Sequence, residues 1–216
     1  MIAFLKRYEW LGTLGMARRR FGLRVGDDLA AVVGFGPLGS HTSFRALLPH
    51  AEAGQVIQLV RGASAPWAHT HAPSHLISRA SKVLARDHSC IAIAAFADPR
   101  AGEAGTIYQA CNAIYLGTTS TGGAEAFIVH GKRYSARRAY KHFGSTAHAH
   151  LLRIDPEASQ IPRARKHRYV IPIGPPRTRQ RVRRLLEPLE QSYPVRTPLA
   201  GSYREILDAA IPLRRG

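Results

Sequence analysis

Short apolar runs separated by turn sequences dominate the first third of the chain. Residues 21–25 and 29–35 are strand-like and flank Gly26-Asp27-Asp28, a turn sequence typical of a β-hairpin. Residues 55–60 are mostly β-branched or apolar, which favours another strand. The pattern therefore predicts a β-hairpin followed by a third strand.

A helical pattern follows this β-structure. Between residues 75 and 86 the apolar positions recur with the 3.6-residue period of an α-helix, and Ser74 precedes them as a candidate cap. Residues 90–96 are almost wholly apolar, as in a strand buried on both faces. Residues 106–116 again fit the helical period and predict a second helix.

The second half of the chain completes an α/β pattern. Residues 127–130 and 168–173 predict strands, and residues 135–143 predict a basic helix. The fold class is therefore α/β, a mixed sheet flanked by helices, over a domain at residues 1–176. After the Gly-Pro-Pro turn that ends this domain, residues 177–216 are expected to form a basic extension, part helix and part Pro-punctuated tail.

Composition excludes several classes of protein. With 216 residues and 45% hydrophobic content, the chain can bury a substantial core, but no stretch approaches the roughly 20 apolar residues that cross a bilayer. We therefore expect no membrane partner. Cys90 and Cys111, the only cysteines, each stand among apolar residues and predict free thiols in a reducing compartment.

The charge is unusually positive and unevenly spread. The net charge is +17, and residues 130–184 hold 15 Lys and Arg against two acids, a net +13. Arginine matches phosphate oxygens, and such a field attracts polyanions, so nucleic acid is the expected partner. The alternative is a solvated basic surface. The candidate phosphate-binding residues are Lys132, Arg133, Arg137, Arg138, Lys141, Arg163, Arg165, Lys166 and Arg168.

Residues 96–117 carry the strongest candidate chemistry. Asp98 follows the buried strand, where its carboxylate can face a cleft at the sheet's edge. Tyr108 and Asn112 lie four residues apart and would share one face of the predicted helix. The structural alternative is that Asp98 caps the loop and that Tyr108 packs with its hydroxyl satisfied.

These residues resemble a known family. The strand–helix–strand–helix core resembles the acyl-CoA N-acyltransferase (GNAT) fold, and roughly residues 4–174 are similar to the phage Mom DNA-modification family. The similarity is carried by residues 8–12 (Tyr-Glu-Trp-Leu-Gly), 76–80 (Leu-Ile-Ser-Arg-Ala), 96–99 (Phe-Ala-Asp-Pro), 105–112 (Gly-Thr-Ile-Tyr-Gln-Ala-Cys-Asn), 115–117 (Tyr-Leu-Gly) and 166–170 (Lys-His-Arg-Tyr-Val).

The resemblance implies a phage- or prophage-encoded enzyme of the bacterial cytoplasm. Such an enzyme adds a carbamoylmethyl-type group to the exocyclic amine of adenine in double-stranded DNA and protects phage DNA from restriction. It implies catalytic roles for Asp98, Tyr108 and Ser78, with Ser81 close enough to compete for the serine role. Tyr8-Glu9 stands where many members carry a His-Tyr pair, so no metal ligand is expected from that region.

The donor is less well defined by the resemblance. GNAT proteins hold the CoA pyrophosphate on a Gly-rich loop that opens a helix, where backbone N–H groups bind phosphate. Residues 61–73 lack that glycine spacing, so the expected cofactor is an activated acyl donor, either acetyl-CoA or an aminoacyl donor. Ser74, Arg79 and Asn112 are its candidate ligands.

Histidines in the same loop raise the question of a metal. His69 and His71 share one side of an extended segment, and imidazoles bind iron or zinc. No cysteine lies nearby to complete a tight site, so no metal is expected.

Modifying adenine in duplex DNA demands base flipping and proton transfer. Asp98 is the candidate base or base-orienting group, and Tyr108 the candidate donor to the leaving group or a developing oxyanion. Candidate aromatic residues for stacking on the flipped base are Tyr8, Trp10 and Trp67. Two alternatives stay open: a GNAT-type acyltransferase acting on tRNA or a small amine, and a non-catalytic nucleic-acid-binding protein.

Overall fold

The computed structural model describes residues 1–9, 11–38, 47–119 and 123–195. The chain divides into two compact units. Unit 1 comprises residues 1–117 and 167–216, and unit 2 comprises residues 118–166. Trp10 therefore lies outside the described residues, as does most of the expected tail.

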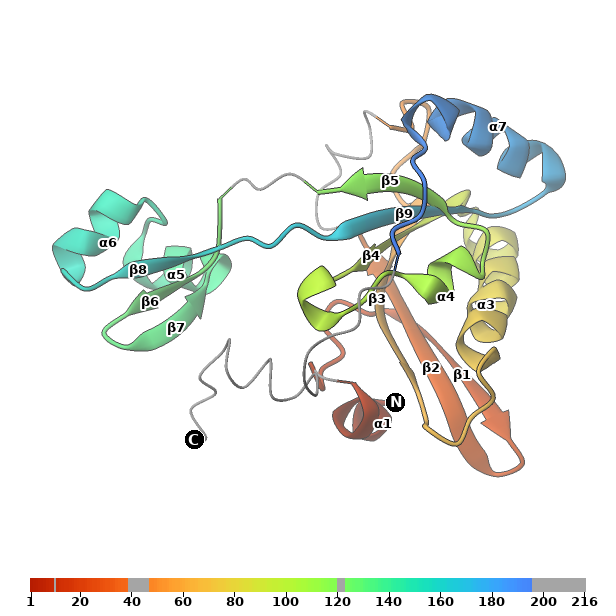
Figure 1. Cartoon of the computed structure of the whole chain (residues 1–216), viewed down its shortest axis with the longest axis horizontal. Coiled ribbons are helices and arrows are strands. Elements are labelled where there is room, and N and C mark those ends of the chain that lie inside the picture. Colours follow the sequence, from red (N-terminus) through yellow and green to blue (C-terminus); the bar gives the residue numbers. More distant parts are fainter. Residues whose placement is uncertain (10, 39–46, 120–122, 196–216) are drawn as a thin grey trace. The chain divides into compact units, whose positions relative to one another are not determined.

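Unit 1 is built on a mixed six-stranded sheet (Figure 1). Its elements are α1 (Ile2–Tyr8), β1 (Arg19–Val25), β2 (Asp28–Pro37), β3 (Val56–Ser64), α3 (Ala72–His88), β4 (Ala92–Ala97), η1 (Pro99–Ala101), α4 (Thr106–Gln109), β5 (Ile114–Thr118), β9 (His167–Pro172), α7 (Pro176–Leu186) and η2 (Glu187–Leu189). The predicted mixed sheet with flanking helices is confirmed.

The strand order is β1-β2-β3-β4-β9-β5. β1, β2 and β3 pair antiparallel, and the predicted β1–β2 hairpin turns at Gly26, whose φ of 59° suits glycine. β3 and β4 pair parallel, joined by the crossover helix α3. β9 pairs antiparallel with β4 and so separates β4 from β5. Antiparallel pairs thus lie on both sides of the parallel pair.

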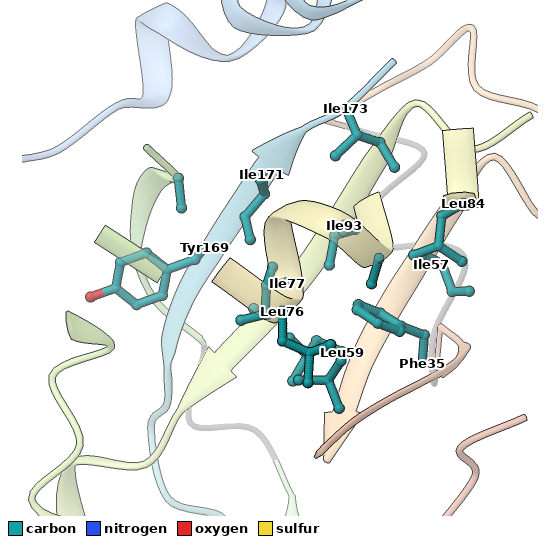
Figure 2. Close-up of a cluster of buried hydrophobic side chains, with 14 of the residues drawn as sticks. Phe35, Ile57, Leu59, Leu76, Ile77, Leu84, Ile93, Tyr169, Ile171 and Ile173 are labelled. Carbon is teal, nitrogen blue, oxygen red and sulfur yellow. The ribbon is translucent and has the colours of Figure 1, made fainter. Parts of the chain in front are cut away.

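Alternate residues of the central strands pack into two cores. Ile57, Ile93 and Ile171 belong to the cluster under α3, together with Leu76 and Leu84 of that helix (Figure 2). Their neighbours Val56, Ala92 and Val170 belong to a second cluster that includes Val182 and Leu186 of α7. This period-two separation means that α3 and α7 cover opposite faces of the sheet.

The predicted helix over residues 106–116 is wrong. The helix α4 ends at Gln109, Asn112 adopts a left-handed φ of 54°, and Ile114–Thr118 form strand β5. The apolar positions matched a helical period because β5 is buried on both faces and its residues do not alternate with polar ones. Consequently Tyr108 and Asn112 do not share a helix face.

Unit 2 forms a smaller α/β body with its own sheet. Its elements are β6 (Ala124–Val129), β7 (Lys132–Ser135), α5 (Ala136–Phe143), α6 (His148–Ile154) and β8 (Ser159–Pro162), with strand order β7-β6-β8. Phe127, Val129 and Leu151 are at most 2% exposed and form its core. The basic helix predicted at residues 135–143 is confirmed, with Ser135 as its N-cap.

The described part of the C-terminal extension packs on unit 1. α7 contributes buried residues to the sheet's second core, as described above. Beyond it, the Gln191 N–H donates to the Tyr115 carbonyl at 2.9 Å, and the Tyr193 hydroxyl donates to the Ala113 carbonyl at 2.5 Å. This segment therefore lies along β5. Among the described residues, no helix is long and apolar enough to cross a membrane.

Adjacent leucines on α7 provide a matched test of this packing. Leu186 is 0% exposed and Leu185 is 36% exposed. Leu186→Ala should lower the free energy of unfolding by about 2–5 kcal/mol, because it removes buried methyl groups and leaves a cavity. Leu185→Ala should change it by less than about 1 kcal/mol. Urea denaturation of both variants followed by circular dichroism measures this difference, and equal effects would contradict the docking of α7.

Candidate functional site

Asp98 organises the loop that follows β4. Its Oδ1 accepts the Arg100 backbone N–H at 3.0 Å, which makes Asp98 the N-cap of η1, and its Oδ2 lies 3.2 Å from the Arg100 guanidinium. The Asp98 backbone N–H donates to Glu103 Oε2 at 3.0 Å. The structural alternative for Asp98 is thus confirmed, because its buried carboxylate holds the loop in shape.

The end of this loop is fixed against the core. Gly105 has a φ of 66°, and a Cβ at this position would lie 2.5 Å from the Tyr169 ring. The Tyr169 hydroxyl donates to the Ala104 carbonyl at 2.6 Å. Only glycine meets both demands, so the first turn of α4 starts from a defined position.

Tyr108 places its hydroxyl at the junction of β3 and β4. The hydroxyl donates to the Phe96 carbonyl at 3.4 Å. The Ile173 N–H donates to the Ile91 carbonyl, so the backbone N–H and C=O groups of odd-numbered β4 residues point toward β9. The backbone groups of even-numbered residues, including the Phe96 carbonyl, therefore point toward β3. Among the described residues, the β3–β4 ladder joins only residues 56–58 to residues 92–94. The Tyr108 hydroxyl therefore lies beyond the last parallel pair.

The environment of Tyr108 keeps it protonated. Burial, reinforced by the nearby Glu103 carboxylate, raises the pKa of the Tyr108 phenol. A neutral phenol at physiological pH donates a hydrogen bond rather than accepting a proton. This protonation state is the one that stabilising a leaving group or oxyanion requires.

A large cleft lies along one side of α3. Its volume is about 810 Å³, and its walls are α3, the turn at residues 110–112, the end of β9 and the start of α7. Residues from His71 to Arg86 line it, a span of about 22 Å at 1.5 Å per helical residue. Cations at its walls are Lys82, Arg86 and Arg179.

The three α3 serines that line this cleft differ in their hydrogen bonds. The Ser74 hydroxyl donates to the His71 carbonyl at 3.0 Å, and the Ser81 hydroxyl donates to the Ile77 carbonyl at 2.7 Å. The exposed Ser78 hydroxyl makes no hydrogen bond within the described part of the chain. This difference favours Ser78 over Ser81 as the serine able to bind a ligand.

The structure brings some of the predicted donor ligands together. Ser74 and Asn112 line the cleft with Ser78, whereas the exposed Arg79 does not line it. Ser74 is not the helix cap, because α3 begins at Ala72 after His71. The cap prediction failed because Pro73 occupies the first turn, where its missing N–H costs nothing.

Sequence reasoning did not single out the cations of the cleft. Lys82 and Arg86 lie on the polar side of α3, and Arg179 comes from α7, nearly one hundred residues later. Arg183 of α7 closes the same region, since its guanidinium donates to the Asn112 carbonyl at 2.8 Å. The i, i+4 spacing of Lys82 and Arg86 was the available sequence signal.

The aromatic candidates have different environments. Trp67 is 54% exposed in the segment between β3 and α3, which leaves its indole free to stack on a base. Tyr8 packs against Phe4 with ring centroids 4.7 Å apart, and the Arg7 guanidinium lies over its ring. Next to it, Glu9 forms an ion pair with Arg61 at 3.8 Å, and burial raises the pKa of its carboxyl.

The two loop histidines lie close to each other. The His69 and His71 rings have centroids 5.3 Å apart. Within the described ranges, no group of three or more His, Cys, Asp or Glu side chains could hold a metal ion. Cys90 and Cys111 are free thiols, and Cys111 lines the cleft.

The predicted phosphate-binding residues fall mainly in unit 2. Exposed cations there are Lys132, Arg133, Arg137, Arg138, Lys141, Arg163 and Arg165, with Lys166 half-buried. Arg168 belongs instead to β9 of unit 1. Its guanidinium donates to the Leu116 carbonyl at 2.9 Å, and burial lowers its pKa. This contact ties Arg168 to the sheet, and its role as a phosphate ligand stays a prediction.

Comparison with known proteins identifies the family. The family model of the Mom protein family matches residues 3–195, which is most of the chain. The chain belongs to the Mom protein family. No curated protein matches it. Membership in the Mom family indicates phage DNA modification and implies DNA as the substrate. The matched range includes the loop of Asp98, the α4 tyrosine, the cleft and all of unit 2.

Cys111 reports on the cleft through its reactivity. Burial raises the pKa of its thiol to about 11, so less thiolate is present at pH 8 than for an ordinary cysteine. Alkylation by iodoacetamide should be on the order of 100-fold slower than that of a small thiol of pKa about 8.5, and should accelerate as the pH rises. Intact-mass measurement follows this labelling, with Cys111→Ser identifying the site. Rapid alkylation at pH 8 would contradict the packed turn.

Proposed function

We propose that this Mom-family protein transfers a carbamoylmethyl-type group from an activated donor to the exocyclic amine of adenine in duplex DNA. The observation that carries the proposal is the placement of residues 106–112. Tyr108 in this segment sets its hydroxyl at the β3–β4 junction, while Cys111 and Asn112 form a wall of the basic cleft. One short segment thus joins a hydrogen-bond donor to a site suited to a phosphate-bearing donor.

A GNAT-like transferase is consistent with this arrangement. The α3 helix begins at the carboxyl end of β3 and leads to the parallel strand β4, a position where α/β proteins bind ligands. The cleft cations Lys82 and Arg179, together with Arg86, which also pairs with Asp87, favour a carbamoylmethyl donor that carries phosphate. Ser78 supplies a hydroxyl that no described residue occupies.

The reaction requires two proton transfers. The adenine amine attacks the activated carbon, forming the N–C bond while the bond from that carbon to the leaving group breaks. The amine loses its proton to solvent water, and the leaving group takes one from solvent while the neutral Tyr108 hydroxyl stabilises it by a hydrogen bond. The Asp98 carboxylate is already paired with Arg100. We therefore assign Asp98 to orienting this loop rather than to abstracting the proton directly.

The base must leave the duplex before it reacts. Flipping costs a few kcal/mol, which stacking against an aromatic side chain offsets in part. The exposed Trp67, which follows β3, is the best placed of the described aromatic candidates. The product carries an altered Watson–Crick edge, as expected for DNA that escapes restriction.

Nucleoside analysis tests the proposed function. DNA from bacteria that express the protein should contain a deoxyadenosine species heavier by one carbamoylmethyl group. Tyr108→Phe should lower its yield by about 100-fold or more, as expected when one hydrogen-bond donor to a developing negative charge is removed. Asp98→Asn should also lower it, because the Arg100 pairing weakens. Mass spectrometry of digested DNA and RNA measures both.

Matched controls separate chemistry from folding. Tyr134→Phe in unit 2 and Asp28→Asn at the exposed β1–β2 turn make the same chemical changes elsewhere and should retain full modification. Melting temperatures of all four variants should stay within a few degrees of each other. If RNA carries a modified nucleoside while deoxyadenosine stays unmodified, the acceptor of the transferred group is tRNA rather than DNA.

A further inference from the structure

Unit 2 interrupts the sheet of unit 1 between two neighbouring strands. The chain leaves β5 at Thr118 and returns at His167 as β9, which is hydrogen-bonded to β5 in the sheet. At the neck of unit 2, the Thr119 N–H donates to the Lys166 carbonyl at 2.9 Å, and the Lys166 N–H donates to Thr119 Oγ1 at 3.0 Å. An insertion with its own core can acquire a function separate from the sheet that carries it.

The charge of unit 2 is strongly positive. Its sequence holds nine Lys and Arg residues against Glu125, Asp155 and Glu157. Two of the acids have structural partners. The Glu125 carboxylate pairs with Arg133 at 3.2 Å, and Asp155 accepts the backbone N–H groups of His130 and Glu157. The acids of this unit therefore do little to neutralise its remaining cations.

The helix α5 concentrates the unpaired charge. Arg137, Arg138 and Lys141 are exposed, and no described carboxylate lies within ion-pair distance of them. At 100° per residue these three side chains and Tyr140 form one continuous arc of the helix. Tyr140 is 64% exposed, whereas Ala139 on the other side is fully buried in the core of unit 2.

A rigid base supports this arc. Ser135 caps α5 by accepting the Arg138 N–H at 3.4 Å. Tyr134 stacks on His142 with ring centroids 5.6 Å apart and meets Phe143 edge-on at 5.0 Å. These contacts bind the helix to β7 and the core, so the exposed cations project from a fixed scaffold.

We propose that unit 2 holds duplex DNA through α5. Arg137, Arg138 and Lys141 bind phosphates of the backbone, and the Tyr140 ring contacts the adjacent sugar or base. This inference rests on the proposed function for the identity of the nucleic acid as DNA. Binding is independent of base sequence, because phosphate contacts position a duplex without reading it. Adenine is selected in unit 1 and the duplex is retained by unit 2.

A triple variant with a charge-matched control tests this division. Arg137→Ala, Arg138→Ala and Lys141→Ala together remove three exposed cations from α5, and alanine favours the helix. The control removes three exposed arginines from α7 by Arg177→Ala, Arg181→Ala and Arg184→Ala. Both variants lose three positive charges, so any difference between their affinities for DNA is caused by the position of the cations.

The measurement is fluorescence anisotropy of a labelled DNA duplex over a series of KCl concentrations. The α5 triple should weaken binding at least tenfold to every duplex sequence and should reduce the salt slope by about 2.7 log units per log unit, or about 0.9 for each phosphate lost. The α7 triple should keep the wild-type slope within about one unit. Tyr140→Ala should weaken binding, and Tyr140→Phe should restore it.

Several outcomes would overturn the inference. Equal losses in the two triples would show that net charge alone drives binding. Unchanged affinity in the α5 triple, with circular dichroism showing a folded protein, would make α5 a solvated face. Tighter binding of an RNA duplex of equal length would replace DNA by RNA as the partner.

The proposed function can fail independently of this test. Tyr108→Phe should bind the DNA duplex as the wild type does, since binding needs no turnover. If digested DNA contains no modified deoxyadenosine while the α5 triple still loses binding, the DNA-holding role stands and the proposed chemistry falls.

Discussion

The short parallel ladder between β3 and β4 is the constraint on which the site of unit 1 depends. It joins only residues 56–58 to residues 92–94, although β3 continues to Ser64 and β4 to Ala97. Backbone groups beyond the ladder need other partners, because a buried carbonyl without one is costly. The Phe96 carbonyl finds its partner in the Tyr108 hydroxyl. The same requirement that stabilises the sheet therefore fixes the position of the proposed hydrogen-bond donor.

The loop from Asp98 to Gly105 transmits this constraint to the cleft. Asp98 caps the first turn after β4. The Tyr169 hydroxyl binds the Ala104 carbonyl, and the Tyr169 ring packs against Gly105. With both ends held, α4 needs only four residues before Asn112 turns the chain into β5. A polar network that serves structure and chemistry at once explains why Asp98 is buried beside Arg100 rather than open to solvent. Its loss would displace Tyr108 even if Asp98 never touched a substrate.

The sequence alone predicted those helices and strands whose pattern of apolar residues has a single interpretation. The buried strand β4 and the helix α3 were predicted because their apolar residues fit only one period over a sufficient length. The segment 106–116 was misread because a fully buried strand gives no alternation, and the left-handed Asn112 leaves no clear signal. Unit 2 was not recognised as a separate body, since its four-residue strands β7 and β8 are too short and polar to stand out. The candidates Asp98 and Tyr108 were chosen from their place in the chain after the buried strand. Arg179 was not, because only the tertiary fold brings α7 to the wall of the cleft.

The proposed separation of DNA binding in unit 2 from chemistry in unit 1 would solve an electrostatic problem. A donor with phosphates and a DNA backbone are both polyanions, and each would compete for one basic surface. In this chain the cleft cations Lys82, Arg86 and Arg179 belong to unit 1, whereas Arg137, Arg138 and Lys141 belong to unit 2. Two basic surfaces on separate bodies can bind two polyanions at once. Insertion of unit 2 between β5 and β9 leaves the β3–β4 junction intact, so the proposed DNA-binding surface can change without disturbing the position of Tyr108.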